Sequence, residues 1–328
     1  MHQGQTLIAS YTAQVRRTLQ VDRYCDITAC DLGNLLKFMN RVSRAIAVIL
    51  IVFGCITSVL VQTPQSALTV PPPVQESPPR GGDVAETINF GRHFQELGVE
   101  GSIAIYDLNS DRLYQHNPQR NATAFLPAST FKILNSLISL ETGAISDELA
   151  VLTWDGTQRQ IPAWNRDLNM REAIKLSAVW FYQVLARRVG HEQMQKWVAK
   201  VGYGNQKIGN KDDIDKFWLE GELRITPNEQ IQFLRRLYKN DLPFSERSLS
   251  LVKDIIIVEQ TPDYTIRAKT GWANFGEQTK PQIGWYVGYL EKDKNVYFFA
   301  TNIDIRNNND ASARIELTRR CFKDLALL

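Results

Sequence analysis

One short motif pairs a serine with a lysine at a spacing that could perform nucleophilic chemistry. Ser129 stands three residues before Lys132, which places both side chains on one face of a helix. A serine hydroxyl needs a neighbouring base, and a lysine is a base only if burial lowers the pKa of its amine from about 10.4. The apolar neighbours Phe131, Ile133 and Leu134 favour such burial. The motif predicts an acyl-transfer nucleophile; a helix cap beside an exposed lysine is the alternative.

Three further motifs follow the serine-lysine pair along the chain. They are Ser177-Ala178-Val179, Tyr203-Gly204-Asn205 and Lys269-Thr270-Gly271. Lys269 and Thr270 end an alternating segment, which predicts a strand whose cation and hydroxyl face a substrate carboxylate. A backbone N–H just after this strand would help to bind an oxyanion. Each triplet is common by itself, but together, in this order after the serine motif, they are specific.

Alternating and helical patterns predict the scaffold that must position these motifs. Two pairs of alternating segments predict β-hairpins, at residues 102–108 with 113–115 and at 284–291 with 296–303. Helical patterns lie between the hairpins, for example at 131–140, 170–189 and 227–238. The helix at 227–238 opens with a capping box at Thr226 and a proline in its first position. We therefore expect a mixed α+β fold, in which an antiparallel sheet formed by the N- and C-terminal hairpins packs with a helical lobe.

Composition restricts the classes of partner and cofactor. The 328 residues are 44% hydrophobic and 22% charged, which is enough for one large folded domain. The net charge of +3 comes with no long basic run, so no nucleic-acid partner is expected. Only Cys321 of the four cysteines lies in the expected domain, which excludes a disulfide within it. The four histidines stand beside no cysteine or carboxylate at metal-ligand spacing, so no metal site is predicted.

The chain is predicted to hold two unstructured segments besides its folded domain. Residues 1–38 carry mixed charge and two cysteines, and we interpret them as a non-native or disordered extension, with Met39 as the true start. Residues 63–82 are rich in proline, glutamine and glycine and predict a linker. The catalytic domain is expected to span residues 83–328.

A targeting segment is predicted at residues 39–62. The run 45–61 is apolar and uncharged, and Arg41 and Arg44 precede it. This pattern predicts a signal peptide or membrane anchor that exports the rest of the chain to the periplasm or to the outer face of the cytoplasmic membrane. Three fates stay open: cleavage, an uncleaved anchor that holds the protein at the membrane, and lipid attachment at Cys55.

With these elements in place, residues 85–328 resemble a class D β-lactamase, the oxacillinase type of serine enzyme. Several stretches outside the four motifs match the same family, namely Trp154-Asp155-Gly156, Trp164-Asn165-Arg166-Asp167, residues 177–190 and residues 217–221. Val179 stands where a class A enzyme would need asparagine, which disfavours class A. The resemblance implies the fold shared by serine β-lactamases and penicillin-binding transpeptidases. It also implies hydrolysis of the β-lactam ring of penicillin-type antibiotics through an acyl-serine intermediate.

The resemblance implies five catalytic residues and no cofactor other than carbon dioxide or bicarbonate. Ser129 would attack the lactam carbonyl, and Lys132, carbamylated to N6-carboxylysine, would be the general base. Trp218 would donate a hydrogen bond to this carbamate. Ser177, assisted by Lys269, would pass a proton to the departing lactam nitrogen.

The resemblance also implies a set of residues that contact the small-molecule β-lactam. They are Val179, Tyr203, Asn205, Thr270, Gly271, Trp272 and Arg314. The backbone N–H groups of Ser129 and Trp272 would form the oxyanion hole, and Arg314 would bind the substrate carboxylate through its planar guanidinium. Two alternatives stay open: Arg314 as a surface arginine at a helix start, and Trp218 as a core side chain.

Three rival functions share these motifs. A membrane-tethered β-lactam sensor would be acylated without turnover, but the chain has one apolar segment and His191-Glu192 lacks the second histidine of a zinc-protease motif. A transpeptidase is disfavoured by Ser177-x-Val179 and by Trp218. The intact motif set disfavours a catalytically dead relative. The range of β-lactams and the oligomeric state are left open.

Overall fold

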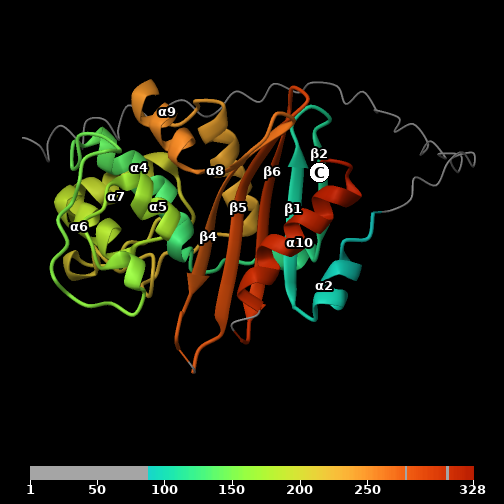
Figure 1. Ribbon diagram of the computed structural model, residues 1–328, viewed down its shortest axis with the longest axis horizontal. Helices are drawn as coiled ribbons and strands as arrows, with labels where there is room; N and C mark the ends of the chain where they lie inside the picture. The colour runs from blue at the N-terminus through green and yellow to red at the C-terminus, as the bar shows by residue number, and fades with distance from the viewer. Residues whose placement is uncertain (1–87, 278, 308–309) are drawn as a thin grey trace, which may run out of the picture. The chain divides into compact units, whose positions relative to one another are not determined.

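The computed structural model describes residues 88–277, 279–307 and 310–328, and these contain a six-stranded antiparallel sheet (Figure 1). Its strands lie in the order β2-β1-β6-β5-β4-β3. They are β1 (Gly101–Asp107), β2 (Arg112–His116), β3 (Ile257–Gln260), β4 (Tyr264–Ala273), β5 (Gln282–Lys292) and β6 (Asn295–Ile305). The N-terminal strand β1 pairs with the late strand β6, so the two ends of the domain meet in the middle of the sheet, as the α+β prediction requires.

Both predicted hairpins are confirmed. β1 pairs with β2, and β5 pairs with β6. The second hairpin closes through Asp293 and Lys294, whose φ angles of 50° and 64° are both positive, as a two-residue type I′ turn requires. Because β4 also pairs with β5 along its whole length, the strand that contains Lys269-Thr270-Gly271 is fixed to the hairpin, and it continues two residues beyond this motif to Ala273.

Helices surround the sheet and form a lobe beside it. They are α2 (Gly91–Leu97), α3 (Pro118–Asn121), α4 (Lys132–Glu141), α5 (Met170–Leu176), α6 (Val179–Val189), α7 (His191–Val201), α8 (Pro227–Tyr238), α9 (Glu246–Ile255) and α10 (Asp310–Asp324). Short 3-10 helices cover Ala128–Phe131, Pro162–Trp164 and Lys211–Asp213. Figure 1 shows α4 to α7 gathered on the side of β4 as the predicted helical lobe. The capping box at Thr226 is confirmed, because its Oγ1 accepts from Glu229 N at 3.0 Å.

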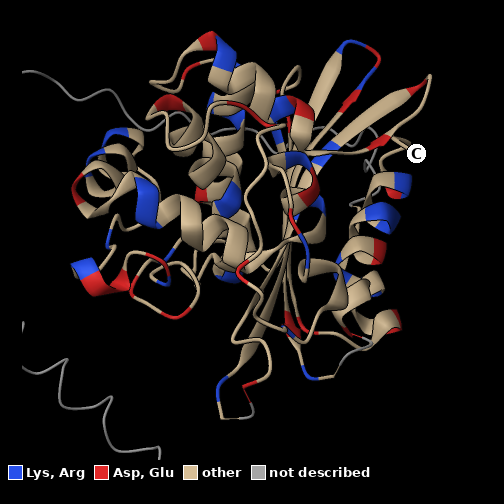
Figure 2. Ribbon diagram, turned by 60° about the vertical axis from the view of Figure 1, so that its left-hand side comes forward, with Lys and Arg blue, Asp and Glu red and all other residues tan. Residues whose placement is uncertain are grey.

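Two layers of core lie on opposite faces of the sheet. Successive strand residues point to opposite faces, and Phe298 and Phe299 of β6 illustrate this. The ring of Phe298 lies 5.8 Å from Tyr238 of α8, and that of Phe299 lies 5.2 Å from Phe322 of α10. Charged residues lie mainly on helices and turns, while the middle of β5 and β6 carries none (Figure 2).

Several predictions concern segments outside the described residues. These are the extension 1–38, the targeting segment 39–62 and the linker 63–82. Within the described ranges, no helix combines the length and apolar character needed to cross a membrane. Cys321 is a buried free thiol on α10.

Candidate active site

The 3-10 helix Ala128–Phe131 delivers Ser129 directly to the start of α4, where Lys132 is the first residue. Residues three apart eclipse each other in a 3-10 helix, and Lys132 Nζ donates to Ser129 Oγ at 2.6 Å. Ala128 adopts a positive φ of 48°, and its N–H donates to Trp218 O at 2.9 Å. The serine and lysine of the first motif are therefore in direct contact.

The Lys132 side chain is completely buried. Its Nζ lies 5.6 Å from the ring centre of Tyr182. Burial, followed by the positive charge of Lys269, lowers the pKa of the Lys132 amine well below its ordinary value. The exposed-lysine alternative is therefore wrong, and burial favours the neutral form of the amine beside Ser129.

Ser177 lies between two lysines because the chain breaks its helix there. The helical pattern at 170–189 predicted one helix, but α5 ends at Leu176 and Ser177 takes left-handed angles of φ 55° and ψ 33°. Its Oγ accepts from Lys269 Nζ at 3.0 Å and from Lys132 Nζ at 3.4 Å. Burial and the nearby charge of Arg314 lower the pKa of Lys269 to about 7. The Ser177 hydroxyl thus bridges the amines of Lys132 and Lys269.

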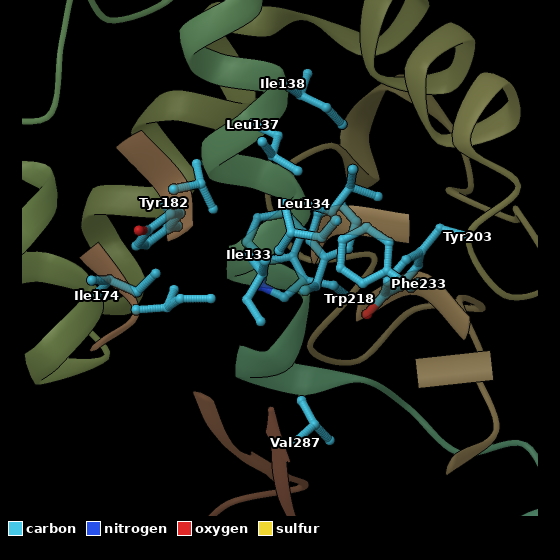
Figure 3. Close-up of a cluster of buried hydrophobic side chains, with 14 of the residues drawn as sticks. Ile133, Leu134, Leu137, Ile138, Ile174, Tyr182, Tyr203, Trp218, Phe233 and Val287 are labelled. Carbon is cyan, nitrogen blue, oxygen red and sulfur yellow. The ribbon is translucent and has the colours of Figure 1, made fainter. Parts of the chain in front are cut away.

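Trp218 is buried behind the nucleophile. Its ring stacks on Phe131 at 5.5 Å and 26°, and Figure 3 shows it beside Leu134 of α4 and Tyr203. Its Nε1 is buried without a hydrogen-bond partner among the described residues. An indole N–H can only donate, so the site contains a buried donor that lacks an acceptor.

A cavity of about 340 Å³ opens in front of Ser129. Ser177 and Val179 line it from the helical lobe, and Thr270, Gly271 and Trp272 line it from β4. Gly271 has a steric reason to be glycine, since a Cβ there would lie 3.1 Å from Pro127 O. The missing side chain lets the strand lie against the turn that holds the nucleophile.

Arg314 reaches the cavity from α10 and is not a surface residue. Its guanidinium lies 5.8 Å from the ring centre of Trp272. Its Nε and Nη1 are buried and find no partner in the described part of the chain, and burial lowers the pKa of Arg314 to about 10. Two unpaired donors in a planar group are suited to a carboxylate.

Two predicted substrate-binding residues, Tyr203 and Asn205, are not brought to this cavity. Tyr203 is buried, and its hydroxyl accepts from Gln230 Nε2 at 3.3 Å. Asn205 Oδ1 accepts from Arg224 N at 3.0 Å, and its Nδ2 donates to Glu222 O at 2.9 Å. Neither lines the cavity, and the hydrogen bonds of this triplet support the turn structure behind the site.

Sequence reasoning gave no role to the apolar wall of the cavity. This wall consists of Ile161, Trp164, Leu176, Leu219 and Phe275. Such side chains have no motif of their own, although Trp164 and Leu219 lie in stretches that match the family. Among the described residues, no cluster of three or more histidine, cysteine or acidic side chains could hold a metal ion.

Comparisons with known proteins agree with this geometry. Residues 102–325 match the family model of the penicillin binding protein transpeptidase domain. β-Lactamase OXA-5 of Pseudomonas aeruginosa is 43% identical over 237 residues, which cover 72% of this chain and 88% of the relative. β-Lactamase OXA-48 of Klebsiella pneumoniae is 43% identical over 238 residues, covering 73% and 88%.

Solved structures show the same relationship. The crystal structure of the class D β-lactamase YbXI from Nostoc is 61% identical, with a TM-score of 0.72 over 74% of this chain and 100% of that one. A class D β-lactamase from Fusobacterium nucleatum is 39% identical, with a TM-score of 0.70 over 73% and 98%. The chain therefore belongs to the class D serine β-lactamases, hydrolases of the β-lactam ring within the penicillin-binding transpeptidase family.

Proposed function

We propose that the enzyme opens the β-lactam ring through an acyl intermediate on Ser129, with carbamylated Lys132 as the general base. The observation that carries this proposal is the buried Lys132 amine, 2.6 Å from Ser129 Oγ. Its lowered pKa favours the unprotonated amine, and an unprotonated amine is the form that adds to carbon dioxide. The addition forms an N–C bond and releases one proton, which leaves a carboxylate on the lysine.

The surroundings of Lys132 fit this modification. A new carboxylate needs hydrogen-bond donors, and Trp218 Nε1 is a buried donor that lacks an acceptor. Leaving such a group unpaired costs about 1–3 kcal/mol, so an acceptor on the lysine would remove that cost. The Ser129 hydroxyl supplies a second donor. Phe131 and the Tyr182 ring keep the pocket apolar, which favours the neutral amine before carbon dioxide adds.

In the proposed acylation, Ser129 Oγ gives its proton to modified Lys132 and forms a bond to the lactam carbonyl carbon. The ring C–N bond then breaks, and its nitrogen takes a proton from Ser177, which is resupplied by Lys269 at 3.0 Å. The backbone N–H groups of Ser129 and Trp272, both at the cavity, hold the developing oxyanion. Modified Lys132 then returns its proton through Ser177 to Lys269. In deacylation, modified Lys132 takes a proton from water as the water attacks the ester carbon, the bond from that carbon to Ser129 Oγ breaks, and Oγ takes the proton back from modified Lys132.

The proposed substrate orientation follows from the side chains of Arg314 and Thr270, which both line the cavity. Arg314 and Thr270 would bind the carboxylate that penicillins and cephalosporins carry beside the lactam nitrogen. The lactam carbonyl would then face Ser129. This orientation is supported by the two unpaired guanidinium nitrogens of Arg314.

A time course with a chromogenic cephalosporin tests the mechanism. We expect many turnovers per enzyme, stimulation by bicarbonate, and loss of turnover in Lys132→Ala. The matched control is Lys196→Ala, which removes an exposed lysine of α7 and should leave the rate unchanged. A burst of about one equivalent followed by no further hydrolysis would contradict the proposal, since it would mean acylation without turnover.

We also propose that this reaction takes place after export, in the periplasm or on the outer face of the cytoplasmic membrane. The support is the uncharged apolar run 45–61 behind Arg41 and Arg44. Cell fractionation and N-terminal sequencing of the secreted form test it. Recovery of the full-length protein only from the cytoplasm would contradict it.

A further inference from the structure

A second cavity of about 320 Å³ adjoins the substrate cavity, and Thr270 lines both. It forms where the edge strand β3 stops covering β4. The last pairing joins Ile257 to Arg267, and Ala268 N donates to Ile256 O at 2.9 Å. Beyond Ala268, β4 has no strand neighbour on this side within the described sheet. The second cavity is therefore a side extension of the site along the strand that binds the substrate.

Aliphatic side chains make up about half of the lining of this second cavity, and some of them are open to water. Val258 of β3 is 55% exposed, and Ile315 of α10 is 37% exposed. Ile174 and Ala268 form the buried part of the wall. Apolar side chains around a hollow favour an apolar occupant, because its burial removes their surface from water.

The charges around this hollow are mostly compensated. Glu259 Oε2 lies 2.6 Å from Arg319 Nη1, and both residues line the cavity. The Tyr286 side chain also lines it and carries a hydroxyl that can donate a hydrogen bond. Lys269 lines it as well, and its Nζ donates to Ser177 Oγ at 3.0 Å and to Thr270 O at 2.9 Å. Lys175 at the end of α5 is the other lysine among the lining residues. Since Glu259 and Arg319 neutralise each other and Lys269 is hydrogen-bonded to Ser177 and Thr270, the aliphatic side chains are the part of the lining that is left to contact an uncharged group.

We propose that this cavity is a subsite for an uncharged apolar or aromatic substituent of the β-lactam. The inference rests on the proposed function, in which Thr270 and Arg314 bind the substrate carboxylate. In a cephalosporin, the ring carbon that bears this carboxylate is bonded to C3, so a C3 substituent leaves the ring beside the carboxylate. Thr270 belongs to both cavities, and Ile315 directly follows Arg314. A C3 substituent thus has a direct path into the second cavity.

The test uses two cephalosporins with the same acyl side chain, one with hydrogen at C3 and one with an uncharged arylthiomethyl group. The measured quantity is the ratio of their kcat/KM values. Val258→Asp places a charge in the apolar wall, and we expect this ratio to fall about tenfold relative to the unmodified enzyme. Because the same two substrates are used with both enzymes, the difference in their leaving-group chemistry cancels when the two ratios are compared.

Val151→Asp is the matched control, since Val151 is also a largely exposed valine, at 60%, and lines neither cavity. Ile315→Asn is a second variant, in the α10 wall of the cavity. It tests the same ratio if Val258→Asp does not fold. An unchanged ratio in the folded variants, or an equal loss for both substrates, would overturn the subsite. Failure of the unmodified enzyme to hydrolyse either cephalosporin would instead overturn the proposed function.

Discussion

Gln230 Nε2 donates a hydrogen bond of 2.8 Å to Thr130 Oγ1, and Thr130 Oγ1 in turn donates to Pro127 O at 2.8 Å. Gln230 and Thr130 are completely buried. Pro127 and Thr130 lie on either side of Ser129, so a glutamine of α8 fixes the turn that carries the nucleophile. Tyr203, which was expected to contact the substrate, completes this network through its hydroxyl.

Gln230→Leu should therefore lower kcat while KM changes little. The turn would lose its support, and a displacement of about 1 Å can cost on the order of 100-fold in rate. We expect a fall of about tenfold or more in single-turnover acylation. Gln232→Leu, at an exposed position of the same helix, is the control and should keep the normal rate. Equal rates in both folded variants would show that the network has no positioning role.

Trp218→Phe should weaken carbamylation while it keeps the ring stacked on Phe131. The change removes the buried Nε1 donor, and one hydrogen bond to a charged acceptor is worth about 1.5–3 kcal/mol. We expect the bicarbonate concentration for half-maximal activity to rise about tenfold or more. The control is Trp197→Phe, which alters a ring of α7 that stacks on Phe244. A bicarbonate requirement that stays constant would remove Trp218 from the proposed role.

The serine-lysine contact could be predicted from sequence because it is local. Ser129 and Lys132 are three residues apart, and helical spacing alone brings them together. The strand position of Lys269 followed equally from alternation within its own segment. The α+β class followed from the two hairpins, whose strands and turns are also local patterns.

The remaining features depend on contacts between distant segments. The left-handed Ser177 interrupts what looked like one helix, and its hydroxyl meets Lys269 from a strand far along the chain. The triplet at Tyr203 and Asn205 was predicted to contact the substrate, but its side chains bond to α8 and to nearby backbone. A motif does not report which way its side chains face. The lack of an acceptor for Trp218 Nε1 could be recognised only once the surroundings of this side chain were known.

Arg314→Leu should weaken substrate binding and stabilise the fold. Without a carboxylate, Arg314 holds two buried nitrogens that have no partner among the described residues, and an apolar side chain would remove that cost of about 1–3 kcal/mol. We expect a higher melting temperature and a KM raised about tenfold or more. Arg320→Leu on the same helix removes an arginine paired with Glu316 and should raise neither the melting temperature nor KM. A variant with normal KM and lower stability would mean that Arg314 is structural.

Lys269 should make the stability of the folded enzyme depend on pH. Its pKa is about 7 in the folded protein and about 10.4 in an unfolded chain. Between these values the unfolded chain binds a proton that the native state lacks, so unfolding takes up protons and the free energy of unfolding rises with pH. The contribution of Lys269 to the free energy of unfolding is complete above about pH 10.4, and it is lost progressively as the pH falls to about 7.

Denaturant titrations between pH 7 and 10 would measure this slope, which reaches about 1.4 kcal/mol per pH unit for one lysine. Lys269→Met cannot bind the proton and should flatten the curve by that amount. Lys196→Met, at an exposed position of α7, should leave the curve unchanged. If Lys269→Met kept the full slope, Lys269 would be protonated in the folded state up to high pH. Ser177 would then have beside it a permanent cation, which does not readily give up the proton that the proposed acylation requires.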